Sequence, residues 1–144
     1  MAALLYQPDI DAVRMRLTAF WEGAGLGRPA LHIICPRTAP VENIPPMPKP
    51  ANWITDYSVS DMGYRRHLAR TTATTSMYFA EGVPSASPDL APNCLALFQG
   101  CTGVEMPGTV WCKPFIHDPD TDTPAYCFDP DNRYWRFCNE LLAA

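Results

Sequence analysis

The sequence has few charged residues and no long apolar run. Charged side chains make up 18% of its 144 residues, against about 25% in an average soluble domain. No apolar run approaches the ~18 consecutive residues of a membrane-spanning helix. Its 11 basic and 15 acidic side chains form no basic block that could follow a phosphate backbone. We therefore expect a protein that binds neither nucleic acid nor membrane.

Several sequence motifs that would define a function are also missing. The N-terminus lacks the basic region and the ~7–15-residue apolar run of a signal peptide, so we expect a cytoplasmic protein with reduced thiols. An even count of six cysteines would suit three disulfides in a secreted domain. However, there is no Cys-x-x-Cys pair, and the tightest gap, from Cys94 to Cys101, has no histidine at zinc-finger spacing. The glycines of residues 23–27 follow an expected helix and not a strand, the reverse of the order in a dinucleotide-binding loop.

Proline and apolar residues are abundant. Sixteen residues are proline, about twice the usual ~5%, and 47% are hydrophobic, which excludes a disordered chain. Six prolines lie in residues 36–52, which predicts an extended connection within one domain. Few charges and many prolines indicate long connections and surfaces that another part of a larger fold covers.

The spacing of apolar residues predicts an α/β chain. A first helix begins after Asp9 and carries one apolar stripe from Ile10 to Trp21. The nearly continuous apolar run of residues 30–35 predicts a strand buried on both faces, as in a parallel sheet. Further expected elements are a helix over 61–75, a strand or helix extension over 77–79, a short helix over 91–99, and short strands over 109–112 and 115–116.

The last expected element is a helix with a well-defined start. Asp129, Pro130 and Asp131 supply an N-cap, a proline at the first helical position and negative charge in the first turn. Its apolar stripe consists of Tyr134, Cys138, Leu141 and Leu142. No glycine cap or basic last turn follows, so we expect this helix to continue in a longer protein.

An ordered series of segments resembles uroporphyrinogen-III decarboxylase-like proteins. The order and spacing fit over about residues 10–142. This resemblance implies a TIM (β/α)₈ barrel of some 200 to more than 400 residues, with residues 1–144 as its N-terminal portion. The matching segments are 16–23 (Arg-Leu-Thr-Ala-Phe-Trp-Glu-Gly), 28–37 (Arg-Pro-Ala-Leu-His-Ile-Ile-Cys-Pro-Arg), 78–84 (Tyr-Phe-Ala-Glu-Gly-Val-Pro), 89–92, 97–101, 109–114 (Thr-Val-Trp-Cys-Lys-Pro) and 128–135 (Phe-Asp-Pro-Asp-Asn-Arg-Tyr-Trp).

The resemblance implies one of two activities for the parent protein. In the cofactor-independent decarboxylases, arginines after the first barrel strand bind the carboxylates of a tetrapyrrole, and Arg37 falls at that place. A later aspartate contacts the pyrrole nitrogens, and Asp89 is its counterpart. The full motif of two arginines around Gln-Ala-Gly is absent, and Ala91 replaces a glycine, which argues against authentic uroporphyrinogen decarboxylation. In the corrinoid-linked methyltransferases, a His and two Cys of the C-terminal half bind zinc, so none of these cysteines inherits that role.

Four residues are candidates for the site. Arg37 follows a predicted strand, where barrel active sites form, and an arginine there can bind a carboxylate through two hydrogen bonds. Glu81 and Asp89 lie in a proline-containing loop, where a carboxylate can act in proton transfer or bind a pyrrole N–H. Trp111 lies near a strand end and can line a pocket. The alternatives are a solvated arginine, a helix cap at Asp89 and packing at Trp111.

The histidines carry less weight. The position of His32 within a strand predicts a core histidine, and His67 is expected on a solvated helix face. His117 adjoins Asp118 but has no third metal ligand at suitable spacing. We therefore expect no cofactor in this segment, with zinc and a corrinoid possible only in a methyltransferase-type parent.

Two hypotheses of function remain open. In the first, the chain is an inactive fragment of an enzyme for a carboxylated tetrapyrrole or for corrinoid-linked methyl transfer. In the second, it is a small stand-alone binding module that uses an apolar, low-charge surface. For the fragment, we expect poor folding and an unpaired edge at the strand of residues 30–35. The DNA after codon 144 distinguishes the hypotheses, because only the first requires the rest of a barrel.

Overall fold

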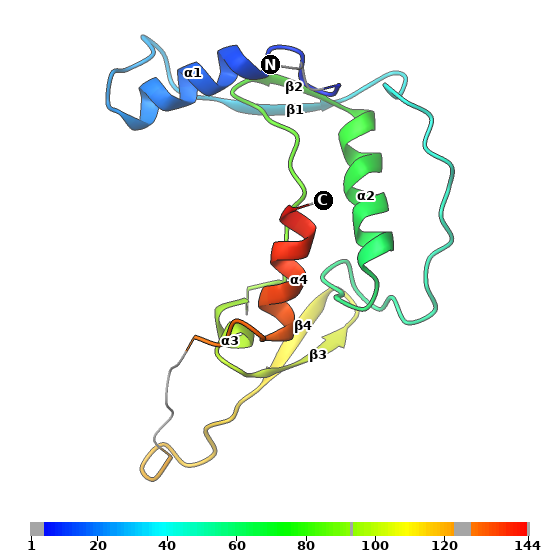
Figure 1. Ribbon diagram of the computed structural model, residues 1–144, viewed down its shortest axis with the longest axis vertical. Helices are drawn as coiled ribbons and strands as arrows, with labels where there is room; N and C mark the ends of the chain where they lie inside the picture. The colour runs from blue at the N-terminus through cyan, green and yellow to red at the C-terminus, as the bar shows by residue number, and fades with distance from the viewer. Residues whose placement is uncertain (1–4, 93, 123–127, 144) are drawn as a thin grey trace. The chain divides into compact units, whose positions relative to one another are not determined.

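The computed structural model describes residues 5–92, 94–122 and 128–143. It has a mixed α/β fold, as the sequence predicts (Figure 1). The strands of the described chain form two separate antiparallel pairs, β1–β2 and β3–β4. The elements are α1 (Ile10–Trp21), β1 (His32–Pro36), α2 (Met62–Thr75), β2 (Ser76–Ala80), α3 (Cys94–Phe98), β3 (Thr102–Met106), β4 (Thr109–Lys113) and α4 (Arg133–Leu142).

The chain divides into two compact units, which are described separately below. Unit 1 consists of residues 1–46 and 67–86, and unit 2 of residues 47–66 and 87–144. None of the helices in the described part combines the length and apolar content that crossing a bilayer requires.

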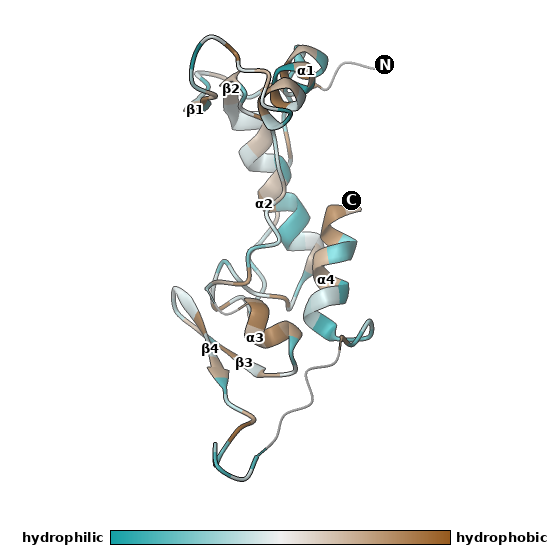
Figure 2. Cartoon of the chain, turned by 90° about the vertical axis from the view of Figure 1, so that its left-hand side faces the viewer, coloured by the Kyte–Doolittle hydropathy of each residue, from teal (hydrophilic) through white to brown (hydrophobic). Residues whose placement is uncertain are grey.

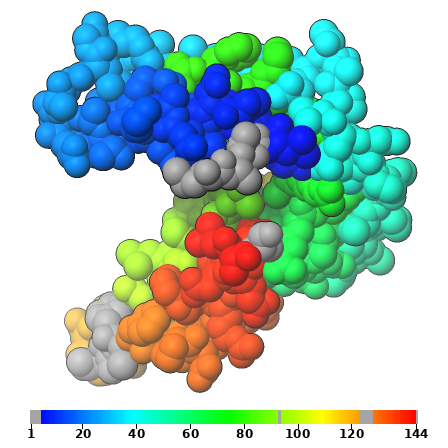
Figure 3. Space-filling model, turned by 45° about the horizontal axis from the view of Figure 1, so that its top comes forward, coloured from blue at the N-terminus to red at the C-terminus, as the bar shows by residue number. Residues whose placement is uncertain are grey.

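Helix α1 of unit 1 has the predicted bounds. Ile10 and Val13 of its stripe are buried, but Phe20 and Trp21 at its C-terminal end are 43% and 80% exposed. Asp9 occupies the N-cap position without a side-chain capping hydrogen bond. The helix therefore buries only its first turns. Figure 3 shows α1 in blue.

Strand β1 differs most from its prediction. It pairs antiparallel with β2, in a register that runs from His32 opposite Ala80 to Pro36 opposite Ser76. Ile33 and Ile34 are 40% and 51% exposed, so the prediction of a strand buried on both faces is wrong for the described chain. A two-stranded sheet offers one neighbouring strand and covers neither face by itself. For the same reason His32 is exposed and is not a core histidine.

Unit 2 has a core between a hairpin and two helices. Strands β3 and β4 pair along their full length, and β3 is absent from the sequence prediction. Residues 115–116, predicted as a strand, lie outside the strands. Figure 2 shows α3 as strongly apolar. The core residues from these elements are Leu97, Val110, Tyr134, Phe137, Cys138 and Leu141.

Gly103 sits where β3 approaches α4 most closely. Its N–H donates to the Tyr134 hydroxyl at 2.9 Å. A Cβ at this position would lie 2.7 Å from that oxygen and 3.0 Å from a Leu97 methyl, so only glycine fits.

Helix α4 begins later than predicted. Its N-cap is Asn132, whose side-chain oxygen accepts hydrogen bonds from the N–H groups of Tyr134 and Trp135. Asp129 instead closes a preceding turn by accepting from the N–H of Asp131. The amide of Asn132 also donates to the carbonyl oxygens of Leu97 and Phe98 at the end of α3. Asn132 thus caps α4 with its side-chain oxygen and binds α3 with its amide group, and for this reason the N-cap is Asn132 and not Asp129. Leu142, predicted on the apolar stripe, is 65% exposed.

Candidate functional site

The most elaborate polar cluster of unit 1 surrounds the Glu81 side chain, which is 2% exposed. One carboxylate oxygen accepts from Arg16 Nε at 2.8 Å and from Arg28 Nη2 at 2.6 Å. The other accepts from Arg28 Nη1 and from the Leu31 N–H, both at 2.9 Å. Arg28 therefore binds the carboxylate through two parallel hydrogen bonds, the strongest geometry for such a pair. We call Arg16, Arg28 and Glu81 the Glu81 cluster.

These contacts keep Glu81 ionised. The Arg28 guanidinium, followed by the Leu31 N–H and Arg16, holds the pKa of the Glu81 carboxyl far below its usual range. In return, Glu81 raises the pKa of Arg28. Four donors occupy the carboxylate, so in this chain Glu81 stabilises the fold and is not available to bind a substrate.

The backbone around Glu81 is tightly constrained. Ala80 has a φ of 55°, and Gly82 donates its N–H to the Phe79 carbonyl oxygen at 2.8 Å. A Cβ on Gly82 would lie 2.8 Å from the Ile33 carbonyl oxygen. The turn Ala80–Gly82 therefore needs glycine at position 82, because a side chain there would clash with the backbone of β1. This turn places the Glu81 carboxylate beside the start of β1.

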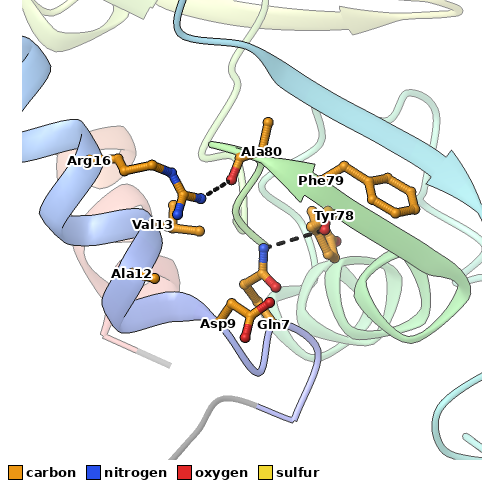
Figure 4. Close-up of a pocket in the computed structure, with 8 residues that line it drawn as sticks. All are labelled: Gln7, Asp9, Ala12, Val13, Arg16, Tyr78, Phe79 and Ala80. Atoms are coloured by element: carbon orange, nitrogen blue, oxygen red, sulfur yellow. Dashed lines mark hydrogen bonds between the residues drawn. The ribbon is translucent and has the colours of Figure 1, made fainter. Parts of the chain in front are cut away.

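A small polar cavity adjoins this cluster (Figure 4). Its volume is about 180 Å³, below the roughly 300–1,000 Å³ of most ligand pockets. Arg16 crosses it to donate to the Ala80 carbonyl oxygen at 2.7 Å, and Gln7 reaches the Tyr78 carbonyl oxygen at 3.4 Å. This cavity is too small for a tetrapyrrole. It is lined by Gln7, Asp9, Ala12, Val13, Arg16, Tyr78, Phe79 and Ala80.

Arg37 lies at the other end of the β1–β2 pair. Its Nε donates to the Ser76 carbonyl oxygen at 2.7 Å, and its Nη2 to that of Tyr6 at 3.5 Å. Its Nη1 makes no hydrogen bond recorded among the described residues. Arg37 and Glu81 flank opposite ends of a five-residue strand, so they do not share one site.

Sequence reasoning missed a second ion cluster in unit 1. Glu42 accepts two hydrogen bonds from Arg70, both at 2.8 Å, and a further one from the Tyr6 hydroxyl. Arg70 and then Tyr6 lower the pKa of Glu42 to about 2, and the bond to Glu42 raises the pKa of Tyr6. Glu42 lies in the proline-rich connection, so this cluster ties that connection to α2. No local pattern predicts a contact across 28 residues.

Asp89, in unit 2, stabilises a turn of the backbone. Its carboxylate accepts from the Ala91 N–H at 2.9 Å, which closes a turn. Ala91 has a φ of 67°, and α3 spans Cys94–Phe98, so Asp89 is not the cap of a helix that starts at Ala91, as the alternative reading of the sequence has it. Its carbonyl oxygen accepts from Arg65 Nη2 at 2.6 Å.

Arg65 is an unexpected neighbour of Asp89. The residue is 7% exposed, and its Nη1 is buried without a hydrogen-bond partner among the described residues. Burial lowers the pKa of Arg65, against the opposing charges of Asp89 and Asp56. No sequence pattern indicates this burial, because Arg65 stands beside a second arginine in a weakly patterned helix.

The remaining candidates in unit 2 are exposed. Trp111 on β4 is 65% exposed. The backbone N–H groups of His117 and Asp118 both donate to Asp122. Within the described ranges, no three His, Cys, Asp or Glu side chains come together as metal ligands.

The cysteines in the described residues are all free thiols. Cys101 and Cys138 are buried, Cys35 and Cys112 are half-buried, and Cys94 is exposed. Burial raises the pKa of the Cys112 and Cys138 thiols, which makes them poor nucleophiles. Cys127 lies outside the described residues.

The four predicted site residues are divided between the two units. Arg37 and Glu81 belong to unit 1, and Asp89 and Trp111 to unit 2. Comparisons with family models, curated proteins and solved structures give no match to this chain.

Proposed function

We propose that this chain is the N-terminal portion of a uroporphyrinogen decarboxylase-like (β/α)₈-barrel protein. The parent acts on a carboxylated tetrapyrrole-type substrate or takes part in corrinoid-linked methyl transfer. The observation that carries this proposal is the Glu81 cluster.

The cluster unites three segments on which the resemblance rests. Arg16 belongs to the segment of residues 16–23, Arg28 opens that of residues 28–37, and Glu81 lies in that of residues 78–84. These residues are 12 to 65 positions apart, yet their charges pair around one buried carboxylate. Gly82, beside Glu81 in the third segment, is required by the same turn. Residues from three separate segments thus form one ion cluster. This supports the interpretation that the three segments belong together, as the resemblance implies.

Two of the candidate residues keep unused capacity for a substrate. Arg37 retains Nη1 for a carboxylate, and an arginine can bind a carboxylate in the plane of its guanidinium. Asp89 uses one carboxylate oxygen to close a turn, which leaves the other to accept a pyrrole N–H. In the parent, we assign Arg37 to substrate binding and Asp89 to the catalytic site, with Trp111 as a wall of the pocket. Zinc and a corrinoid belong to the methyltransferase alternative, and their ligands to another part of that parent.

The test uses the gene together with the coding DNA that follows codon 144. The longer product is assayed with uroporphyrinogen III, by chromatography of the porphyrins, and with a methylated corrinoid and a thiol, by absorbance. Turnover in either assay, reduced at least tenfold in Asp89→Asn but not in Asp129→Asn, supports the proposal. A folded longer product without turnover in both assays contradicts it.

A second candidate function is a non-catalytic binding module. The observation that favours it is the exposure of large apolar side chains in unit 1, with Trp21 at 80%, Met15 at 69% and Ile34 at 51%. Contiguous exposed apolar side chains mark an interaction site, and the Phe20 and Trp21 rings are in edge-to-face contact. This function predicts that the 144-residue chain alone binds a partner, whereas the first proposal predicts activity only in the longer product.

A further inference from the structure

The two outer edges of the β1–β2 sheet differ in whether their backbone groups are hydrogen-bonded. Alternate residues of an antiparallel strand turn their backbone groups toward the partner and away from it. Glu81 donates its N–H to the Leu31 carbonyl oxygen, and Arg37 donates its own to that of Thr75, so the odd-numbered residues of β1 face β2. His32 and Ile34 therefore point their N–H and C=O groups outward.

At the outer edge of β2, side chains donate hydrogen bonds to the outward carbonyl oxygens. The outward carbonyl oxygens of Ser76, Tyr78 and Ala80 accept from Arg37, Gln7 and Arg16, in that order. Figure 4 shows Gln7 and Arg16 reaching β2 across the cavity. Such capping is one way in which proteins prevent an edge strand from pairing with another chain.

The outer edge of β1 has no comparable protection. No hydrogen bond recorded among the described residues involves the backbone of His32 or Ile34. Residues 32–36 include no Lys, Arg, Asp or Glu, and Ile33 and Ile34 are 40% and 51% exposed on opposite faces. An uncharged edge strand with exposed apolar side chains is a template for strand addition.

We propose that β1 pairs antiparallel with β1 of a second copy of this chain about a two-fold axis at Ile34. In this register the two Ile34 residues exchange both backbone hydrogen bonds. Each His32 N–H donates to the Pro36 carbonyl oxygen of the other copy, so four hydrogen bonds form in all. Proline has no N–H to donate, and in this register it lies at the end of the ladder. The result is a four-stranded antiparallel sheet.

The absence of charged residues in β1 favours a second copy of this chain as the partner of its outer edge. A two-fold pairing places each strand opposite itself, so a charged strand would oppose its own charge, whereas residues 32–36 bring no like charges together. The contact is five residues long, at the low end of interface sizes, below about 1,200 Å². The dimer is therefore weak and depends on concentration. In the barrel proposed above, this edge of β1 would pair within the parent protein, so the inference concerns the 144-residue chain by itself.

The experiment is sedimentation velocity of the purified chain over a dilution series. Ile34→Lys places two like charges at the axis, and Ile54→Lys is its matched control, since Ile54 is 50% exposed in unit 2. We expect a reversible dimer in the unchanged chain and in Ile54→Lys, and at least tenfold weaker association in Ile34→Lys. A strictly monomeric unchanged chain, or equal association of the two variants, overturns the proposal.

A second measurement tests the register without a charge at the axis. In the two-fold pairing, residue 33 faces Cys35 of the other copy at a Cα separation of about 4.5 Å, which suits a disulfide. Mild oxidation with diamide then converts Ile33→Cys, but not Ile54→Cys, into a covalent dimer. Equal cross-linking of both variants, or of neither, contradicts the register.

Discussion

The substitution Asn132→Ala tests how α4 is held in unit 2. Asn132 caps the helix by accepting from two backbone N–H groups and also donates to the Leu97 and Phe98 carbonyl oxygens. Loss of such a cap costs about 1 kcal/mol. Loss of two neutral hydrogen bonds at a half-buried position adds about 1 kcal/mol in total. We therefore expect Asn132→Ala to lower the free energy of unfolding of unit 2 by about 2 kcal/mol.

Two further variants separate the contributions. Asn132→Asp keeps the capping oxygen and loses the amide donors, so it costs about 1 kcal/mol. Asp129→Ala removes only an exposed turn contact and costs less than about 0.5 kcal/mol. The ranking of the three variants is the prediction.

Urea unfolding followed by tryptophan fluorescence measures these costs. Three of the four tryptophans, Trp53, Trp111 and Trp135, lie in unit 2, so the fluorescence reports mainly on that unit. At an m-value of about 2 kcal/mol/M, Asn132→Ala shifts the midpoint by about 1 M. A larger shift for Asp129→Ala than for Asn132→Ala would refute the reasoning and restore Asp129 as the cap.

The remaining predictions concern unit 1 and the thiols. Glu81→Gln lowers the unfolding midpoint of unit 1, seen by circular dichroism, whereas Asp11→Asn leaves it unchanged because the pair of Asp11 with Arg14 is exposed and 3.8 Å long; equal effects would refute this. Gly82→Ala costs about 1–3 kcal/mol, because its Cβ meets a backbone oxygen, and a neutral result would contradict the turn geometry. In the folded state the pKa values of Glu42 and Glu81 lie below the usual 4.5, so their ion pairs stabilise unit 1 fully above about pH 5. This stability is lost as the pH falls toward 2, and a stability of unit 1 that does not change over this pH range would exclude both clusters. Six thiols should titrate in denaturant without reductant, and a mass six hydrogens light would show disulfides instead.

The sequence predicted the helices well because their pattern is local. The bounds of α1 match, and α2 and the body of α4 lie where periodicity and helix-forming residues place them. The cap of α4 was misplaced by three residues. The Asp-Pro-Asp turn has the composition of a helix start, while the contact that favours Asn132 comes from Leu97 of α3, 35 residues earlier.

Strand pairing and charge pairing could not be read from local patterns. The apolar run of residues 30–35 predicts a strand but not its neighbour, so β1 was expected in a parallel sheet and forms an antiparallel pair with β2. The loop position of Glu81 predicts a site residue, and only the fold reveals that Arg16 and Arg28 bind its carboxylate. The burial of Arg65 likewise depends on residues 87–89, which lie beyond its own helix.

The central claim is that this chain is part of a uroporphyrinogen decarboxylase-like barrel. The most direct test is to read the native DNA that follows codon 144. The account predicts an open frame that continues α4 and encodes further alternating strands and helices, with a His-x-Cys motif if the parent is a methyltransferase. A stop codon with no such coding sequence downstream would contradict the claim.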